Sequence, residues 1–407
     1  MLSWYNLVII YNIEENFMAD TILILGNGFD IAMGRKTKYE DFIDFEKQLY
    51  SNPDKELQDF LKNKDIDLDK YKDNLYLKFI NENKDRLGEN WSSLEIMISQ
   101  LADAIMYFKE NSDFLYHNEY NVPIQPYIDK NKPKWRNNNY SAKSFVADTF
   151  AALFNKKVWK SLERENALKE LNNEFIKHLE LLIELLEIYL SYIDHLDFDD
   201  NKIKPNPTAL DAVDDLSGAD VLNFNYTNTS GELFHTILER THFIHGEVNL
   251  SRPINQINTM VFGIEDKEKD VNSDLIPYQK YYQRVIKETG NKFEEFFIKR
   301  NYTEKNTSVV GRTVSTRVPV SKNIVIFGHS VDPLDKEIFQ KCFKLAELGE
   351  YTYRFIFNYH DDSAKRSIVK NLAIILGKDK LIELTGQRKV VFVKSDDKYG
   401  MGDALLK

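Results

Sequence analysis

The sequence contains a single cysteine, Cys342, among 407 residues, and glycine and proline together contribute only 26 residues. One cysteine excludes an internal disulfide framework and every structural zinc site built from cysteine pairs. The scarcity of glycine and proline excludes collagen-like and low-complexity scaffolds. Apolar residues, by contrast, make up 43% of the chain and aromatic residues 13%. At roughly 150 residues per domain, the chain is long enough for two or three packed units.

The chain also lacks an excess of positive charge and a long apolar run. It carries 54 basic and 64 acidic side chains, which disfavours a protein that wraps nucleic acid over most of its surface. The apolar stretch at residues 7–11 is too short to span a bilayer, and it lacks the basic flank and cleavage site of a signal peptide. We therefore expect a cytoplasmic protein without a membrane partner, translated from Met1 or from Met18.

Short apolar runs bounded by polar residues predict the strands of a parallel sheet. These runs lie at residues 21–25, 220–224, 241–244, 323–327, 353–358 and 389–393. A further short strand is expected at residues 260–262. Helical segments at residues 335–348 and 363–376 alternate with the later strands. This alternation favours an α/β fold with a Rossmann-like, doubly wound parallel sheet.

A long helical region separates the first two predicted strands. Residues 164–196 carry a heptad-like apolar stripe and exceed the usual length of one globular helix, so we expect a bent helix or a helical hairpin. We assign residues 1–38 to the first strand and glycine-rich loop of the α/β domain, and residues 39–215 to an inserted helical domain. Residues 216–407 form the remainder of the α/β domain and include a basic, lid-like segment at 279–322.

The loop after the first strand supplies five candidate ligand-binding residues: Gly26, Asn27, Gly28, Asp30 and Gly34. Glycines at the end of a buried parallel strand permit a tight turn and a close approach of phosphate to the backbone. The helix that follows offers free N–H groups at its N-terminus. However, the dinucleotide fingerprint requires a third glycine where this chain has Ile31, and no Gly-Lys-Ser/Thr follows. A nucleotide-binding loop and a ligand-free tight turn both remain open.

Polar residues with useful chemistry follow the next two predicted strands. Asn225 and Thr227 come after the second strand, and His245-Gly246 comes after the third. Both strand ends lie at the carboxyl edge of a parallel sheet, where open α/β folds bind ligands. Asn225 can fix a ribose or an amide, and His245 can take a proton from a hydroxyl near neutral pH. Helix capping by Asn225 and a hydrogen-bonded buried His245 are the alternatives without a ligand.

The strand at residues 323–327 ends in another polar group, Gly328-His329-Ser330, and Asp335 opens the next helix. His329 and Ser330 are not expected to form a nucleophilic pair, because adjacent side chains rarely face each other and no Gly-x-Ser-x-Gly elbow is present. We count all four residues as ligand-binding candidates. Simple helix capping is the alternative for Asp335.

In their order along the chain, these motifs resemble the AbiH family of bacteriophage abortive-infection proteins. The segments that carry the resemblance are Gly26 to Gly34, Asn225-Tyr226-Thr227, His245-Gly246, Gly328-His329-Ser330-Val331-x-x-x-Asp335 and a Trp91-x-x-x-Glu95 segment in the helical region. The similarity extends over about residues 20–395. It implies an antiphage effector that responds to a phage-derived trigger.

The same motifs are also similar to a divergent sirtuin-like nucleotide fold. In that comparison Asn225 and Thr227 match an Asn-x-Asp motif, and His245 matches the catalytic histidine. The resemblance implies NAD binding, with His245 activating a ribose hydroxyl after nicotinamide leaves. Three departures limit it. Asp30 replaces a small serine that would face the cofactor, and the four zinc cysteines of deacetylases are missing. The helical insertion also replaces the loop that would normally close over the cofactor. An NAD-cleaving or NAD-sensing effector fits these departures better than a deacylase.

Three functions remain open from the sequence. The first is an NAD glycohydrolase-type enzyme, with His245 as base and Asn225 orienting the ribose. The second is a non-catalytic nucleotide- or phage-sensing protein that acts through its helical domain, whose apolar stripe could also support a homo-oligomer. The third, disfavoured by the net charge, is a nucleic-acid enzyme that uses the ten Lys/Arg and interleaved aromatics of residues 279–322. No metal is expected, because His360-Asp361-Asp362 lacks the spacing of a metal site.

Overall fold

The computed structural model describes residues 20–84, 91–115, 123–136, 138–154, 164–199, 203–253, 256–264, 274–298, 302–309 and 312–406. The expectations about the apolar stretch at residues 7–11 and about an alternative start at Met18 lie outside these ranges. In the described ranges, no helix is both long and apolar enough to cross a membrane.

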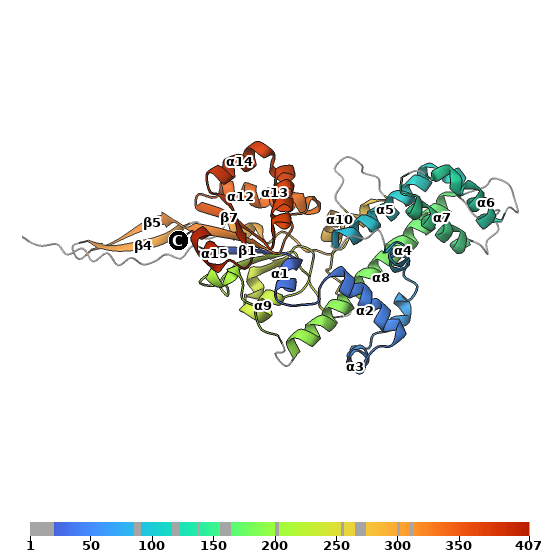
Figure 1. Cartoon of the computed structure of the whole chain (residues 1–407), viewed down its shortest axis with the longest axis horizontal. Helices are drawn as coiled ribbons and strands as arrows, with labels where there is room; N and C mark the ends of the chain where they lie inside the picture. Colours follow the sequence, from blue (N-terminus) through green and yellow to red (C-terminus); the bar gives the residue numbers. More distant parts are fainter. Residues whose placement is uncertain are drawn as a thin grey trace, which may run out of the picture.

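A six-stranded, all-parallel sheet forms the centre of the α/β part, with the strand order β3-β2-β1-β6-β7-β8 (Figure 1). The strands are β1 (Asp20–Leu25), β2 (Asp220–Asn223), β3 (Thr241–Phe243), β6 (Ser321–Phe327), β7 (Thr352–Tyr359) and β8 (Val390–Lys394). Each of the six main apolar runs therefore forms a strand. The expectation of a strand at residues 260–262 is wrong, since this segment has irregular backbone and only Ile264 forms an isolated bridge, to Gln279.

Apolar side chains alternate between the two faces of the sheet, as the twofold period of a strand requires. Ile22 and Ile24 of β1 pack on one face, in a buried cluster that includes Phe339. Leu23 and Leu25 pack on the other face, in a cluster that includes Phe29. The helices that cover the two faces are α12 (Lys336–Leu348), α13 (Asp362–Leu376) and α14 (Lys378–Gly386) on the first, and α1 (Asn27–Ala32) and α15 (Lys398–Ala404) on the second. Covered in this way on both faces, the sheet is the core of a largely helical α/β protein.

Between β1 and β2 the chain forms a set of helices that we call the helical block. Its members are α2 (Tyr39–Ser51), α3 (Lys55–Asn63), α4 (Leu75–Glu82), α5 (Trp91–Glu110), α6 (Ile124–Asn131), α7 (Tyr140–Phe154) and α8 (Arg164–Phe198). These helices share one hydrophobic cluster, which also takes in Met260, Phe262 and Tyr278 from beyond β3. The block lies to one side of the sheet (Figure 1).

Helix α8 is continuous over 35 residues, so the expectation of a helical hairpin is wrong. Its apolar stripe explains this length, because α2, α4 and α7 all pack against α8. Leu171, Phe175, Leu182 and Tyr189 along the stripe are buried. Tertiary packing of an apolar face stabilises a helix far beyond what intrinsic propensity supports.

The segment at residues 279–322 consists of distinct parts, which are α10 (Lys280–Ile286), α11 (Glu294–Ile298), the antiparallel pair β4 (Tyr302–Val309) and β5 (Arg312–Pro319), and the first two residues of β6. The β4–β5 hairpin projects away from the sheet (Figure 1). Phe296 and Phe297 are buried in the core, and Lys280 and Lys322 are buried as well. These side chains are therefore not available as an exposed surface for single-stranded nucleic acid.

The remaining helical elements are short. They are α9 (Thr229–Phe234) and 3-10 turns at Leu68–Tyr71, Ser112–Phe114, Lys132–Trp135, Ala209–Ala212, Leu238–Arg240, Ile276–Tyr278 and Pro333–Asp335. The last of these turns places Asp335 beside the carboxyl edge of the sheet.

Candidate functional site

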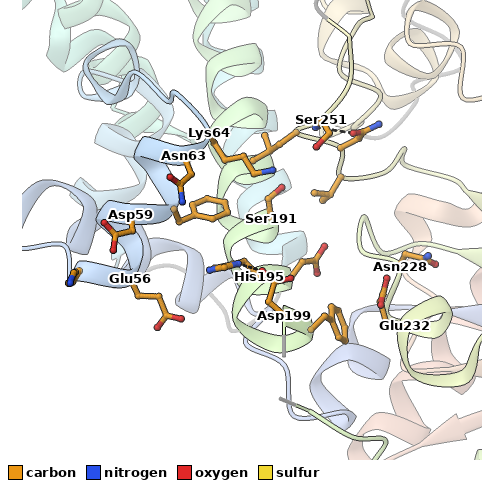
Figure 2. A pocket seen from close by; sticks show the side chains of 17 residues that line it. Glu56, Asp59, Asn63, Lys64, Ser191, His195, Asp199, Asn228, Glu232 and Ser251 are labelled. Atoms are coloured by element: carbon orange, nitrogen blue, oxygen red, sulfur yellow. Dashed lines mark hydrogen bonds and ion pairs between the residues drawn. The ribbon is translucent and has the colours of Figure 1, made fainter. Parts of the chain in front are cut away.

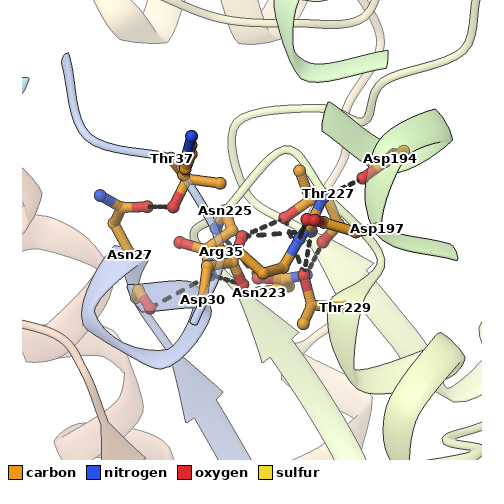
Figure 3. A network of polar contacts seen from close by, with 12 residues as sticks. Asn27, Asp30, Arg35, Thr37, Asp194, Asp197, Asn223, Asn225, Thr227 and Thr229 are labelled. Carbon is orange, nitrogen blue, oxygen red and sulfur yellow. Dashed lines mark hydrogen bonds and ion pairs between the residues drawn. The ribbon is translucent and has the colours of Figure 1, made fainter. Parts of the chain in front are cut away.

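Asp30 lies inside the protein, with its side chain 1% exposed, in a group of polar residues that we call the Asp30 cluster: Asp30, Arg35, Asn225, Thr227 and Thr229. Asn225 Nδ2 donates to Asp30 Oδ1 at 3.2 Å, and the Thr227 hydroxyl donates to Asp30 Oδ2. Arg35 lies 3.6 Å from the same carboxylate (Figure 3). Burial raises the pKa of Asp30, whereas Arg35 and the hydrogen bonds from Thr227, Thr229 and Asn225 lower it.

Arg35 connects this cluster to the end of helix α8. Its Nε donates to Asp197 Oδ2 at 2.8 Å, another of its nitrogens pairs with Asp194, and its guanidinium lies 4.7 Å from the centre of the Phe198 ring. Burial raises the pKa of Asp194 to about 6 despite the opposing effect of Arg35. One buried guanidinium therefore ties the helical block to the edge of the sheet.

The glycines of the first loop are required by a contact between backbones. A Cβ on Gly26 would lie 2.7 Å from the carbonyl oxygen of Gly328, and one on Gly28 would lie 2.8 Å from Gly328 Cα. The N–H of Gly28 donates to the Gly328 carbonyl at 2.8 Å, and that of Phe29 donates to the Gly26 carbonyl at 2.8 Å. These two N–H groups are used within the protein, so phosphate binding by the loop stays a prediction.

The remaining loop candidates also have local roles. Gly34 follows α1 at φ +83°, a left-handed conformation that suits glycine at a helix end, and its N–H donates to the Ile31 carbonyl. Asn27 Oδ1 accepts a 2.8 Å hydrogen bond from the Thr37 hydroxyl. Gly246 has φ +75°, and a Cβ there would lie 1.9 Å from the Thr259 carbonyl oxygen.

Asn225 is not the cap of the following helix. Helix α9 begins after Asn228, which makes no side-chain capping bond. Besides its contact with Asp30, Asn225 Nδ2 lies 3.1 Å from the carbonyl oxygen of Gly26. The Asn225 amide thus donates hydrogen bonds both to the glycine loop and to the Asp30 carboxylate.

A second group, the histidine cluster, comprises His245, His329, Asp335, Lys280 and Glu95. Asp335 stands between the two histidines, with Oδ1 3.3 Å from His245 Nε2 and Oδ2 3.5 Å from His329 Nε2. Asp335 directly precedes α12 but makes no side-chain capping bond. Its carboxylate therefore serves the cluster, and the helix-capping alternative does not describe it.

Hydrogen bonding indicates the tautomer of His329, and burial governs the protonation of His245. His329 Nδ1 accepts the N–H of Val331 at 2.8 Å, which leaves Nε2 as the nitrogen that donates to Asp335. Burial, assisted by Lys280, lowers the pKa of His245 to about 4, although Asp335 opposes the shift. His245 is therefore neutral at pH 7. With Nε2 facing Asp335, its Nδ1 holds the free lone pair, and this buried atom has no hydrogen-bond partner among the described residues.

Lys280 and Glu95 complete the histidine cluster. Lys280 Nζ lies 2.8 Å from Glu95 Oε1 and 3.5 Å from Asp335 Oδ1, and its side chain is 5% exposed. Asp335 keeps a pKa well below its usual value, with Lys280 as the main lowering influence against burial. Burial raises the pKa of Glu95 to about 7, against the effect of Lys280.

The sequence predictions did not assign Lys280 or Glu95 to the site. Glu95 belongs to the Trp91-x-x-x-Glu95 segment of the family resemblance, which was the available signal. Lys280 was counted in the basic segment, and nothing in the sequence distinguishes it there from the other lysines.

The predicted site residues meet at one edge of the sheet, but they fall into two clusters. The described hydrogen bonds and ion pairs join Asn225 and Thr227 to Asp30, and join His245 and His329 to Asp335. The ring of Phe224 lies against the histidines, 5.6 Å from His245 and 4.3 Å from His329 between ring centres. Ser330 is exposed, and its carbonyl accepts a hydrogen bond from Asn371.

A cavity of about 920 Å³ lies beside the Asp30 cluster, between α3, the end of α8, α9 and residues 248–251 (Figure 2). Acidic side chains outnumber lysines in its lining, which includes Glu56, Asp59, Asp194, Asp199 and Glu232 as well as Lys55 and Lys64. Two buried atoms of its wall, Ser191 Oγ and Asn228 Oδ1, have no hydrogen-bond partner among the described residues. Gly26, Asn225 and His245 do not line this cavity.

Residues 22–359 match the model of a family described as bacteriophage abortive infection AbiH. The chain belongs to the AbiH family. This match confirms the family resemblance, and it contains every strand-end motif from Gly26 to Asp335. AbiH membership indicates a role in abortive infection, a response to bacteriophage. No curated protein and no solved structure matches the chain. Across the described residues of this AbiH chain, no group of three or more His, Cys, Asp or Glu side chains is placed to hold a metal ion.

Proposed function

We propose that this AbiH protein is an abortive-infection effector that binds NAD, or a related nucleotide, at the carboxyl edge of its sheet and hydrolyses the bond between nicotinamide and ribose. The strand order supports nucleotide binding. When only the strands of the main sheet are numbered, β3-β2-β1-β6-β7-β8 becomes 3-2-1-4-5-6, the order of Rossmann-like dinucleotide-binding folds. Such folds bind ligands where the order reverses, which here is beside β1.

In this proposal the helical block is an insertion after the first strand of a sirtuin-like nucleotide fold. The partners are a small-molecule nucleotide and a phage-derived trigger, and a homo-oligomer is compatible with the fold. NAD is the substrate, and the reaction needs no metal.

The observation that carries the catalytic proposal is the free Nδ1 of buried, neutral His245, whose Nε2 faces Asp335 at 3.3 Å. In the proposed reaction Nδ1 takes a proton from a water molecule or a ribose hydroxyl, and the water oxygen bonds to ribose C1′. The electron pair of the C1′–N bond passes to the pyridinium nitrogen, so nicotinamide leaves as a neutral molecule. ADP-ribose is the second product, and one proton is released.

Two residues at the same edge of the sheet, one from each cluster, support this role. The Asp335 carboxylate stabilises the imidazolium that forms, as a carboxylate behind a catalytic histidine does in other enzymes. Asn225 positions the glycine loop through its bond to the Gly26 carbonyl.

Nicotinamide release from NAD by the purified protein tests the proposal, with and without lysate from phage-infected cells. We expect His245→Ala to lower the rate by about 100-fold or more, the usual contribution of a general base. His360→Ala is the matched control, because His360 is 77% exposed and lies away from the cluster. A wild-type protein that leaves NAD, NADP and other nucleotides intact under both conditions overturns the proposal.

A non-catalytic sensor is the second candidate, and the cavity of Figure 2 favours it. This cavity is lined by residues of both the helical block and the α/β part, and it includes Asp194, which pairs with Arg35. A ligand there could change how α8 packs against the sheet. A nucleotide-dependent rise in Tm without turnover supports this second candidate over the first.

Nucleic-acid processing is the least supported alternative, since Phe296 and Phe297 are buried. Binding of labelled single-stranded DNA or RNA at low salt would restore it.

A further inference from the structure

Glu95 approaches the histidine cluster from the helical block, whereas the other members belong to the α/β part or to α10. It lies on α5, where the neighbouring Leu94 and Ile98 are buried in the hydrophobic cluster of the block. Its side chain is only 12% exposed. A carboxylate held so far from water is costly unless a charged or hydrogen-bonding partner compensates for it, and the partner within the protein is Lys280.

The charges around Glu95 leave this compensation incomplete. Lys280 of α10 is the cation that faces it, at 2.8 Å, and the acids that act on it are Asp335 of the 3-10 turn and the nearby Asp332. Tyr226, which follows β2, is the other titratable group in its surroundings. Lys280 is also shared with Asp335. Arg284, on the same helix as Lys280, adds a positive charge that acts on His245. Beside Glu95 itself, Lys280 is shared between two carboxylates, so a positively charged ligand group would be stabilised there and an anionic group would be repelled.

We propose that Glu95 is a second catalytic residue, whose carboxylate contacts the ribose that bears the positively charged nicotinamide ring, so that the site selects the oxidised form, with its cationic ring, over the reduced form, whose ring is neutral. This inference rests on the proposed NAD-cleaving function. As the C1′–N bond breaks, positive charge moves from the pyridinium ring to the sugar. A carboxylate beside the sugar stabilises that charge, while His245 Nδ1 takes the proton of the attacking water.

Proton release on binding gives a test that does not require turnover. The probe is a carbocyclic analogue of NAD⁺, which keeps the pyridinium charge but has a methylene group in place of the ribose ring oxygen. A bound cation lowers the pKa of Glu95 from its value of about 7, so protonated Glu95 molecules lose their proton when the probe binds. Calorimetric titrations at pH 7, in buffers of different ionisation enthalpy, measure this release.

We expect the wild type to release a fraction of a proton per probe bound at pH 7, because burial keeps part of the Glu95 population protonated. Glu95→Gln should bind the probe without that release, and NADH should bind the wild type without it. Equal proton release by the wild type and Glu95→Gln overturns the assignment of Glu95.

Turnover gives the second test. Glu95→Gln should lower kcat for NAD by about 100-fold or more and should also raise KM, because the attraction between the carboxylate and the bound cation is lost, and Glu95→Asp should recover part of both losses. Glu180→Gln is the matched control, because Glu180 pairs with buried Lys287 at 3.4 Å, away from the histidine cluster. Melting curves equal to wild type show that each variant is folded.

The outcomes separate the two proposals. A wild type that neither binds nor cleaves NAD overturns the proposed function and this inference with it. A wild type that cleaves NAD at the same rate as Glu95→Gln overturns only the role of Glu95.

Discussion

At the scale of single residues, the protonation of His245 is set by its neighbours. The Asp335 carboxylate faces Nε2 of both His245 and His329, and Lys280 stabilises its negative charge. The same lysine, together with burial, disfavours a positive charge on His245. A histidine that is neutral, buried and oriented by a carboxylate can accept a proton at neutral pH without first losing one.

Removing the charge of Lys280 should therefore change how His245 titrates. We expect Lys280→Met to raise the pKa of His245 from about 4, and Lys280→Arg to leave it low because the positive charge is kept. Nitrogen-detected NMR of labelled histidines measures the pKa and also reports whether Nε2 carries the proton. A His245 pKa that is unchanged in Lys280→Met contradicts the electrostatic explanation.

The low pKa of His245 also makes stability depend on pH in a defined direction. The folded-state pKa, about 4, lies below the ordinary value of 6.5, so this contribution to stability is present above pH 6.5 and decreases as pH falls towards 4. Urea unfolding at several pH values measures the effect. The decrease should be smaller in His245→Gln, which cannot take up a proton; an equal decrease in both proteins would assign it to other groups.

At the scale of elements, the contact between the first loop and the loop after β6 determines which glycines are essential. Gly328 has φ +71°, and a Cβ there would lie 2.0 Å from the backbone nitrogen of Phe29. Gly377 has a similar φ of +82° but has nothing within 4 Å of the added atom. Both positions have a positive φ, and only at Gly328 would an added Cβ collide with neighbouring backbone.

We expect Gly328→Ala to lower the free energy of unfolding by about 3 kcal/mol or more, because the strain of a positive φ adds to a collision between backbones. Gly377→Ala should cost less, about 1–3 kcal/mol, which is the strain of its backbone conformation (φ +82°, ψ 148°) alone. Urea denaturation of both variants gives the comparison. Equal losses would mean that the loop contact adds nothing to the cost.

The elements differ in how well the sequence predicts them. The six strands of the main sheet are predictable because parallel strands buried on both faces are continuous apolar runs. The β4–β5 hairpin is not, since its mixture of threonines, serines and charges has the pattern of a polar loop. Helix α8 is continuous because helices distant in sequence pack along it, and its own residues do not show that.

The candidate site, too, is predictable from the sequence in part only. The meeting of Gly26, Asn225, His245 and Gly328 follows from parallel strands ending at one edge, so the sequence predicts it. The separation into two clusters depends on side-chain directions, and the involvement of Lys280 depends on where α10 packs. Both are products of tertiary structure that no spacing in the chain reveals.

At the scale of the whole molecule, Arg35 holds the helical block and the sheet together. It contacts Asp30 on one side and Asp194 and Asp197 on the other, with its side chain fully buried. Loss of this one cation would leave three carboxylates close together without compensation. The union of the two parts therefore depends on charge as well as on apolar packing.

We expect Arg35→Met to lower the free energy of unfolding by about 3–5 kcal/mol, the usual cost of leaving buried charges without their partner. Arg240→Met is the matched control: Arg240 pairs with Asp220 at 2.8 Å, both partly exposed, and its loss should cost about 1 kcal/mol or less. Urea unfolding measures both values, and limited proteolysis near the end of α8 should accelerate in Arg35→Met alone. Similar costs for the two variants would show that the link is not important.

The pairing of β1 with β6 also has a consequence for how the protein is made. Strand β1 is central to the sheet, yet its partners begin at Asp220 and Ser321, so it leaves the ribosome roughly 200 and 300 residues before they do. At bacterial and eukaryotic rates of about 5–20 residues per second, the delay before β6 appears is about 15–60 s. His329 and Asp335 are translated after β6 begins. A ribosome stalled earlier in the message therefore holds a chain without a complete histidine cluster.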